Sequence, residues 1–430
     1  MNLQSPPSAP ESAPPRAESD VRPAAASPGG AYRSRVPGRI MIVVENRAAF
    51  DDHRVTKQIE TLIQRGYHVY VITMRHPSNR RYSADPLVHL YEYPAPPEPG
   101  SMPAYFVEYG YSFFAAAFLA FRVAVRERID VVQFCQPPDI YFPLAGMLRK
   151  LGVRVVVLDQ RDLLPELYVA RYGSSRRWLI SAIKRLERRS QRNADRIITV
   201  SEYFQRRLLA SSGVPADRVS IVGNGPVLRR VEGAEGDPEL KRGRRYLCCW
   251  VGVVARQDRV DLLVRSIDHL VHELDRKDCQ FVIIGYGDFL AEAKALVVSK
   301  DLTEWVRFTG QVDQAEVFRY LATADVGLDA SLQHEVSPVK AIEYMAFGLP
   351  FVAFDLPGTR AISDGAASYV EPGDVVAHAR AIDALLRNAK RRRDLGKAGQ
   401  ARVREELAWD HQALTYLRLM DQLCLNGART

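Results

Sequence analysis

Short apolar runs alternate with helical stretches through most of the chain, and this alternation narrows the possible folds more than any other feature. Helices separate five strands predicted in the first half, at residues 39–46, 68–73, 129–134, 153–159 and 194–201. The first helix has Val55, Ile59 and Leu62 at helical spacing and ends at Gly66. Strands that alternate with helices predict a parallel sheet covered on both faces, an α/β fold.

The same alternation restarts after a segment rich in Gly, Pro and charge. We expect residues 226–245 to link two Rossmann-like domains, 39–225 and 246–405, that face each other across a central cleft. A C-terminal helix within 406–430 is expected to cross back and pack on the first domain. Its residues that recur at helical spacing are Leu407, His411, Leu414, Leu417 and Met420. Ligands of open α/β sheets bind beyond the carboxyl ends of the strands, so the cleft is the predicted site.

Two segments raise the question of export or membrane insertion. Residues 1–38 are rich in Pro, Ala, Ser and Arg, so we expect a disordered tail, and they lack the continuous apolar run of a secretory signal. Residues 105–125 are long and apolar enough to suggest a membrane span, but Glu108 and Arg122 interrupt them. A packed amphipathic helix is expected there, and the chain is expected in the cytoplasm.

Composition is ordinary for a soluble globular protein, and the net charge favours an anionic partner. The net charge is +8, which suits nucleotide phosphates, nucleic acid or anionic lipid without choosing among them. The five cysteines are scattered without a Cys-x-x-Cys pair, as in a protein of a reducing compartment, and no zinc site is expected. The basic run at 390–393 is short and lies on a late helix, so nucleic-acid binding is not expected.

A basic helix is predicted over 176–193, where the apolar residues Trp178 and Leu186 belong to a stripe beside arginines and lysine. One interpretation is a solvated helix whose apolar stripe faces the core. The other is contact with anionic lipid or with a phosphate-bearing acceptor. We take the first as the expectation, with the second kept open.

The stretch HEVSPVKAIEYMAFGLP, residues 334–350, carries the strongest functional signal. Ser337 and Pro338 predict a helix start at N-cap and N1, and Gly348 with Pro350 predicts its end. This helix is apolar nearly all round except for Lys340 and Glu343, which are three residues apart and share a face. Buried charges need partners, so the two side chains either pair with each other or meet a ligand.

Here the chain resembles the family 4 retaining glycosyltransferases of the GT-B fold. The motif is Glu335, seven residues and then Glu343, followed by EYMAFGLPFVAFDLPGTRAIS. The segments 194–226, 279–288 and 306–328 also resemble that family and follow in the same order. The resemblance covers roughly residues 39–425.

The resemblance implies a role for each matching residue. Glu343 would hold the ribose hydroxyls of a nucleotide-sugar donor, and Glu335 would bind the hydroxyls of the donor sugar. Backbone amides around Ser337 and Val339 would hold the diphosphate at a helix N-terminus. Main-chain groups of Gly310 and Gln311 would line the base pocket. Gly285, in the Gly-Tyr-Gly-Asp turn after a strand, suits a close backbone approach to the nucleotide.

The sequence departs from the family pattern at the phosphates and at the acceptor. Val253 and Asp258 stand where the family has Arg and Lys, so Lys340, Arg256 or Arg259 would substitute, with Lys340 preferred. The glycine pair of the first strand–helix loop is replaced by residues 45–54. The residues that stand near the place of the usual histidine of the reaction centre are Gln133, Gln136 and Arg161.

The resemblance implies transfer of a sugar to a glycan, lipid-linked or small-molecule acceptor, with neither a metal ion nor a separate cofactor. Asp-x-Asp, the metal-binding tripeptide of the other large glycosyltransferase class, does not occur. Contact with the anionic inner face of the membrane is a further expectation. The alternatives are an epimerase or phosphorylase-like enzyme on the same fold and a nucleotide-sugar-binding protein that does not catalyse transfer. A nicotinamide oxidoreductase is disfavoured because Gly-x-Gly-x-x-Gly does not follow the first strand.

Overall fold

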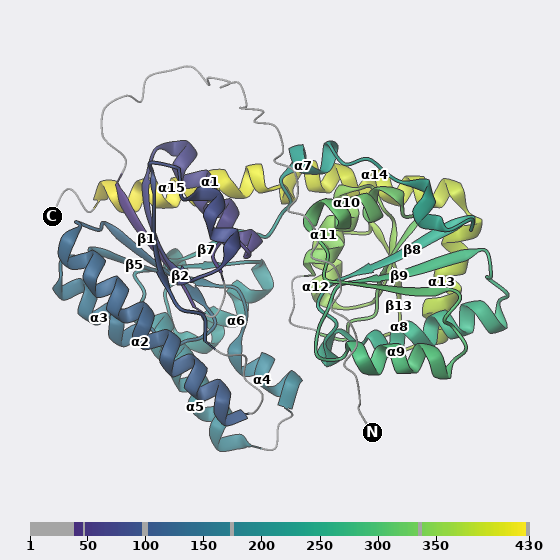
Figure 1. Cartoon of the computed structure of the whole chain (residues 1–430), viewed down its shortest axis with the longest axis horizontal. Coiled ribbons are helices and arrows are strands. Elements are labelled where there is room, and N and C mark those ends of the chain that lie inside the picture. Colours follow the sequence, from purple (N-terminus) through teal and green to yellow (C-terminus); the bar gives the residue numbers. More distant parts are fainter. Residues whose placement is uncertain (1–37, 46–47, 97–101, 173–175, 334–337, 427–430) are drawn as a thin grey trace, which may run out of the picture. The chain divides into compact units, whose positions relative to one another are not determined.

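The computed structural model describes residues 38–45, 48–96, 102–172, 176–333 and 338–426 (Figure 1). These residues build two parallel β-sheets with helices on their faces, and both sheets belong to one compact unit of the chain. The α/β class and the two Rossmann-like sheets expected from the sequence are therefore confirmed. The predictions for Glu335 and Ser337 lie outside the described residues, as does the tail apart from Gly38.

The first sheet has seven parallel strands in the order β3-β2-β1-β4-β5-β6-β7. The strands are β1 (Arg39–Val44), β2 (His68–Met74), β3 (Val88–Tyr93), β4 (Val131–Gln136), β5 (Val155–Gln160), β6 (Arg196–Thr199) and β7 (Val219–Ile221). Sequence reasoning found the five inner strands and missed β3 and β7. Both missed strands lie at sheet edges, where one side of the strand has no partner and polar residues interrupt the apolar run.

The two faces of this sheet are covered by different helices. The helices of this half are α1 (His53–Arg65), α2 (Met102–Arg126), α3 (Phe142–Lys150), α4 (Leu164–Tyr172), α5 (Arg177–Asn193) and α6 (Glu202–Ser212). Met41 and Val43 of β1 pack on one side with α2 and α3, while Ile40 and Ile42 pack on the other side with α1 and the C-terminal helix α15 (Trp409–Asn426). This alternation is the period-two pattern of a buried strand.

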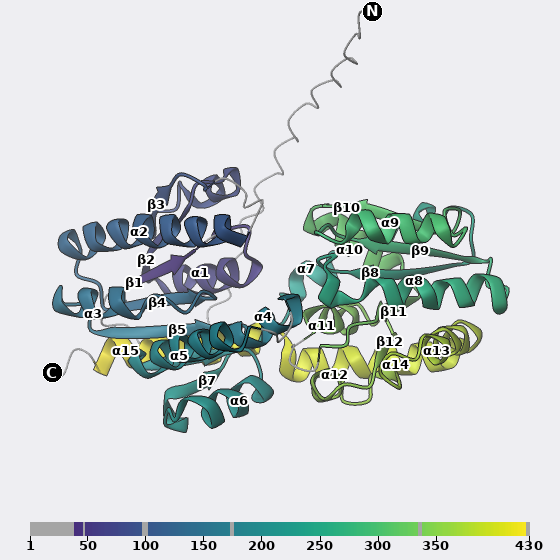
Figure 2. The same ribbon diagram turned by 90° about the horizontal axis from the view of Figure 1, so that it is seen from below.

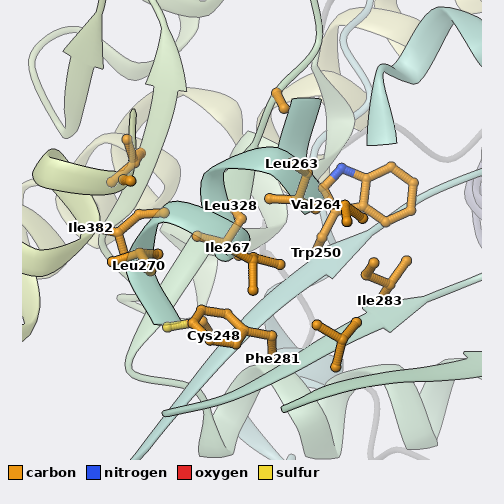
Figure 3. Close-up of a cluster of buried hydrophobic side chains, with 14 of the residues drawn as sticks. Cys248, Trp250, Leu263, Val264, Ile267, Leu270, Phe281, Ile283, Leu328 and Ile382 are labelled. Atoms are coloured by element: carbon orange, nitrogen blue, oxygen red, sulfur yellow. The ribbon is translucent and has the colours of Figure 1, made fainter. Parts of the chain in front are cut away.

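The second sheet has six parallel strands in the order β10-β9-β8-β11-β12-β13. The strands are β8 (Tyr246–Val251), β9 (Cys279–Ile284), β10 (Val306–Gly310), β11 (Val326–Asp329), β12 (Phe351–Phe354) and β13 (Ala367–Val370). Its helices are α8 (Val260–Asp268), α9 (Leu290–Ser299), α10 (Gln314–Thr323), α11 (Val339–Ala346), α12 (Pro357–Ser363), α13 (Val375–Arg387) and α14 (Ala389–Arg402). Figure 3 shows Trp250 of β8 packed with Leu263 and Val264 of α8 in the buried core of this sheet.

Local sequence signals fix the ends of α1. The Asp52 carboxylate accepts hydrogen bonds from the backbone N–H groups of Arg54 and Val55, at 3.0 and 3.1 Å, which satisfies two donors of the first turn. Gly66 ends the helix with a φ of 96°, a conformation that glycine adopts without steric cost. The helix therefore ends where the sequence predicts, and the Asp52 cap sets its start, with Arg54 and Lys57 in its first turns.

Helix α15 follows the second sheet in sequence and packs on α1 of the first (Figure 1). The Trp409 indole N–H donates to the Thr61 hydroxyl at 3.0 Å, and Tyr416 is fully buried beside it. The prediction of which side of α15 is buried is only partly correct, because Leu414 is 54% exposed. Met420 is buried as expected, and Trp409 and Tyr416, which were not in the predicted set, are buried as well.

Three other expectations need correction. Pro338 occupies the N-cap position of α11 rather than N1, because its ψ of 94° is extended and the helix begins at Val339. The segment 226–245, expected to be a linker, contains the short helix α7 (Leu228–Glu232). The helix expected at 105–125 is α2, but it is not fully packed, since large apolar side chains line its outer side. No helix in the described part of the chain has the length and apolar character needed to cross a bilayer.

Candidate active site

A cavity of about 540 Å³ lies at the carboxyl ends of β1, β4 and β5. We call it the large cavity. Glu45 follows β1, Gln136 ends β4 and Arg161 follows β5 at its wall, and helix α1 contributes Arg54 and Lys57. Val339 and Glu343 of α11 also line it, so residues from both halves of the sequence meet there. The carboxyl ends of parallel strands are where α/β sheets bind their ligands.

A second cavity of about 250 Å³, the small cavity, lies at the carboxyl ends of β8 and β11. Gly252, Asp258, Asp329 and Lys340 line it. Val339 and Glu343 line this cavity as well as the large one. Helix α11 therefore forms a wall common to both, and a ligand bound against it can contact groups from both cavities.

A buried ion network fixes the floor of the large cavity. The Arg54 guanidinium donates to both carboxylate oxygens of Asp159 at 2.8 to 3.2 Å, and Arg161 Nε donates to the same carboxylate at 3.2 Å. Burial by itself would raise the pKa of Asp159, but Arg54 and Arg161 outweigh it and lower this pKa to about 2. Arg161 also pairs with Asp52, the cap of α1. The network joins β5 to the first turn of α1 and holds the arginine side chains in place.

Lys57 and Glu343 both line the large cavity. The Lys57 ammonium donates to the Gly225 carbonyl at 2.7 Å and lies 4.9 Å from the centre of the Trp409 ring. Burial, with a further contribution from Arg54, lowers the pKa of Lys57 to about 7. Burial also raises the pKa of Glu343 to about 7, although Lys57 and Lys340 act in the opposite direction. Both groups therefore change charge near neutral pH, which is typical of ligand-binding and catalytic positions.

Lys340 does not pair with Glu343. Its ammonium lies 3.4 Å from Asp258 and 3.5 Å from Asp329, and 4.7 Å from the centre of the Trp250 ring. Burial alone would lower the pKa of Lys340, but the two carboxylates outweigh it and raise this pKa. Asp258 stands in one of the slots that the family fills with a base, and here it holds the lysine of α11. The lysine faces the small cavity with its charge already balanced by two carboxylates.

Glu45 is the most strongly perturbed acid of the large cavity. The side chain is 5% exposed and lies near Glu108 and Tyr141. Burial raises the pKa of Glu45 to about 8, and the nearby Glu108 carboxyl contributes in the same direction. A carboxyl group that is neutral at pH 7 can donate a hydrogen bond as well as accept one. Glu45 can therefore orient a hydroxyl group in the cavity.

The structure brings some of the predicted site residues together and leaves others apart. Val339, Lys340 and Glu343 line the small cavity. The Gly285 N–H donates to the Gly310 carbonyl at 3.1 Å, and a Cβ on Gly285 would lie 1.9 Å from the Gly252 carbonyl oxygen, so only glycine fits this close approach. The residues that line the two cavities, within the described part of the chain, do not include Gly285, Gly310, Gln311 or Arg256. Arg256 instead pairs with Glu292 at 2.8 Å, with 67% of its side chain exposed.

The first-domain candidates also separate. Gln136 and Arg161 line the large cavity, as does Asp162. Gln133 does not reach it, because its amide donates to Gln58 at 2.9 Å and its carbonyl accepts from the Tyr416 hydroxyl at 2.7 Å. Gln133 is therefore a buried link between β4, α1 and α15.

Sequence reasoning missed Arg54, Lys57 and Arg230, three of the basic residues that line the large cavity. Arg54 and Lys57 are three residues apart at the start of a helix that follows the first strand. That position is a recognisable signal, because the first strand–helix loop of an α/β sheet lies at the ligand-binding edge. Arg230 had no such signal, since it lies in the segment read as a linker.

Comparison with known proteins finds a matching family model for each half of the chain. The model of the "Glycosyl transferase 4-like domain" matches residues 52–225, and the model of "Glycosyl transferases group 1" matches residues 245–388. A phosphatidyl-myo-inositol mannosyltransferase of Mycobacterium leprae is 34% identical over 154 residues, which are 35% of this chain. The chain spans only 40% of that relative's length.

Two solved structures share the fold at low sequence identity. Sucrose-phosphate synthase from Thermosynechococcus elongatus superposes with a TM-score of 0.74 at 20% identity, covering 90% of this chain and 100% of that one. Anabaena HepE, solved with UDP and glucose, superposes with a TM-score of 0.70 at 12% identity over the same shares. The sheets therefore have the GT-B arrangement. The two family models, matched in order along one chain, show that this protein belongs to the group 1 glycosyltransferases.

Proposed function

We propose that the chain transfers a glycosyl group from a nucleoside diphosphate sugar to a hydroxyl-bearing acceptor, with retention of the anomeric configuration and without a metal ion. The observation that carries this proposal is the shared wall at α11. Glu343 lines both cavities, so a donor held by Glu343 in the small cavity would present its sugar at the boundary with the large one. The acceptor would then occupy the large cavity.

In this scheme residues of α11 and of other segments contact different parts of the donor. Glu343 accepts hydrogen bonds from the ribose hydroxyls, and Glu335 binds the hydroxyls of the sugar. The amides of the first turn, around Ser337 and Val339, face the diphosphate, where a helix N-terminus favours negative charge. The resemblance would also have main-chain groups of Gly310 and Gln311 contact the base, although neither residue lines the two cavities as the described residues define them. Lys340 supports the phosphates only if a ligand draws it away from Asp258 and Asp329.

The reaction itself breaks the bond between the anomeric carbon and the diphosphate oxygen. The acceptor oxygen forms the new bond on the same face of the sugar, and its proton passes to a departing phosphate oxygen. The leaving diphosphate gains negative charge, which nearby amides and cations stabilise. From the large cavity, Lys57 would add positive charge when it is protonated, whereas Arg54 and Arg230 already pair with Asp159 and Glu60.

Two named proteins support a choice of substrates. HepE was solved with UDP, so a uridine diphosphate sugar is the first donor to test. The mycobacterial relative is named for transfer to phosphatidyl-myo-inositol, which supports a lipid-linked or polyol acceptor. We propose that the chain works in the cytoplasm with peripheral contact to an anionic membrane.

A donor screen tests the proposal. Thermal unfolding is followed with UDP, GDP and ADP sugars, because a ligand that binds only the folded state stabilises it by about 2.7 kcal/mol at a hundred times its dissociation constant. One nucleotide is expected to raise the melting temperature, and transfer to an added polyol or lipid acceptor is expected to continue in EDTA. Failure of every nucleotide to stabilise the chain would contradict the donor assignment.

The ion pairs of Lys340 favour one second candidate, a nucleotide-sugar-binding protein that does not catalyse transfer. Binding without release of the nucleoside diphosphate, measured with the donor that the screen selects, would distinguish it. An epimerase would instead return a changed sugar still joined to the nucleotide.

A further inference from the structure

Helix α2 presents a continuous line of large apolar side chains to solvent. Val107, Phe114, Phe118 and Val125 are 72, 72, 64 and 59% exposed, and Tyr111 and Phe121 are 41 and 42% exposed. Their spacing alternates between four and three residues, so all six lie along one stripe of the helix. Residues on the opposite side, including Ala116 and Ala120, are buried against the sheet. Contiguous exposed apolar surface on this scale marks an interaction site.

Helix α5 exposes a second part of the same surface. Trp178 is 72% exposed and Leu186 is 37% exposed, so the expectation that its apolar stripe faces the core is wrong for these two residues. Arg185, Arg188 and Arg189 are exposed around them. Figure 2 shows α3 between α2 and α5, in agreement with the contacts that α3 makes to both helices. The three helices thus form one layer, with apolar groups on α2 and arginines on α5.

The charge of this layer identifies its partner. Arg122 and Arg126 are exposed on α2, beside the apolar stripe. Among the side chains that the structure describes on α2 and α5, the acids are Glu108, which is half-buried, and Glu187, which is buried. A second copy of the chain would bring arginine against arginine, whereas an anionic surface would neutralise them. Aromatic and aliphatic groups flanked by arginine are typical of helices that lie in a membrane interface.

We propose that α2 and α5 dock the chain on the surface of an anionic lipid bilayer. The α2 stripe inserts between the lipids, with Phe114 and Phe118 at its centre, and the α5 arginines contact the headgroups. At 1.5 Å per residue, α2 is about 38 Å long, so the whole stripe can lie flat in the interface. This inference names the surface behind the proposed membrane contact and does not depend on which sugar is transferred.

Co-sedimentation with lipid vesicles tests the docking surface. The full chain is mixed with vesicles of phosphatidylcholine alone or of equal parts phosphatidylcholine and phosphatidylglycerol. Two double variants are compared with the parent chain, Phe114→Ser/Phe118→Ser on α2 and Arg185→Gln/Arg188→Gln on α5. Matched controls change exposed residues elsewhere, Val298→Ser on α9 and Arg391→Gln/Arg393→Gln on α14. Trp178 gives a second readout, because its fluorescence shifts to shorter wavelength when the indole leaves water.

The parent chain is expected to bind the anionic vesicles, less tightly as salt increases, and to show the Trp178 shift. Each α2 or α5 double variant is expected to lower the partition coefficient at least about tenfold, given roughly fivefold for each arginine near an anionic surface. The controls are expected to bind like the parent. Equal binding by the parent and the α2 variant would overturn the proposal, as would no binding by the parent.

A concentration-dependent dimer that Phe114→Ser/Phe118→Ser abolishes, without vesicle binding, would also overturn it in favour of a second copy of the chain. Nucleotide-induced thermal stabilisation is measured on every variant, which shows that it is folded. The same measurement separates failure of this inference from failure of the glycosyl-transfer proposal, because the two depend on different residues.

Discussion

At the scale of single residues, the charges on α11 show that helical spacing predicts which side chains share a face but not which partners they have. Lys340 and Glu343 share a helix face, and their spacing allowed an ion pair between them. In the structure Lys340 pairs with Asp258 and Asp329, and Glu343 lines the large cavity together with Lys57. Asp258 is far away in the sequence, so no local pattern could reveal it. The pairing of Asp258 with Lys340 can be recognised only when folding brings the carboxyl ends of β8 and β11 side by side.

Lys340→Met is expected to destabilise the fold by about 3 kcal/mol at pH 8, because a buried ion pair that loses one member leaves an uncompensated charge. Asp258 and Asp329 would then face each other with side chains 19 and 4% exposed. Burial raises the pKa of Asp258, so this carboxyl takes up a proton more readily than in the unfolded chain. The loss is therefore expected to be smaller at pH 5 than at pH 8. Urea unfolding at the two pH values measures both.

Two variants control this result. Lys294→Met removes an exposed lysine of α9 and is expected to change the free energy of unfolding by less than about 0.5 kcal/mol. Asp258→Asn in the Lys340→Met background is expected to recover part of the loss. A Lys340→Met protein as stable as its parent at pH 8 would show that the ion pairs contribute nothing.

At the scale of elements, the packing of α15 against the first sheet depends on a close approach between two backbone segments. Gly225 precedes α7, and a Cβ built on it would lie 1.6 Å from the Leu407 carbonyl oxygen, in the π-helical segment Val403–Leu407 before α15. The Gly225 carbonyl also accepts the hydrogen bond from Lys57. The entry into α15 and the wall of the large cavity therefore meet at one residue that has no room for a side chain.

Gly225→Ala is expected to lower the free energy of unfolding by about 2 kcal/mol, because the obstructing atoms are backbone and cannot rotate away. Gly223→Ala is the matched control, since its nearest neighbour is the flexible Gln412 side chain at 3.3 Å. Chemical denaturation of the two variants and the parent compares them directly. A Gly225→Ala variant as stable as Gly223→Ala would mean that the two segments separate without cost.

At the scale of the whole molecule, sequence patterns predicted both sheets and the end of α1 at Gly66, because these depend on local spacing and on strands buried on both faces. They missed β3 and β7, whose edge positions leave polar residues exposed. They also assigned Trp178 and Leu186 to the core, because helical spacing shows that apolar residues share a face but not what covers that face. For the site, the sequence indicated α11 but not Arg54, Lys57 or Arg230, which only the fold brings to the same cavity.

Glu343 on α11 is expected to bind the donor at the boundary between the two cavities. The most direct measurement is the dissociation constant of the nucleotide sugar chosen by the screen, by calorimetric titration at pH 6 and pH 8. The parent chain, Glu343→Gln and the exposed control Glu371→Gln are compared. The pKa of Glu343 is about 7, so the carboxylate that accepts ribose hydrogen bonds forms mostly at the higher pH.

Binding to the parent and to Glu371→Gln is expected to weaken from pH 8 to pH 6 by at most about tenfold, the change in the ionised fraction of Glu343, because Lys57 gains its charge over the same pH range. Binding to Glu343→Gln is expected to be weaker than binding to the parent at pH 8 and to weaken less from pH 8 to pH 6. Binding to Glu343→Gln that equals the parent at pH 8, with the same change at pH 6, would contradict the claim.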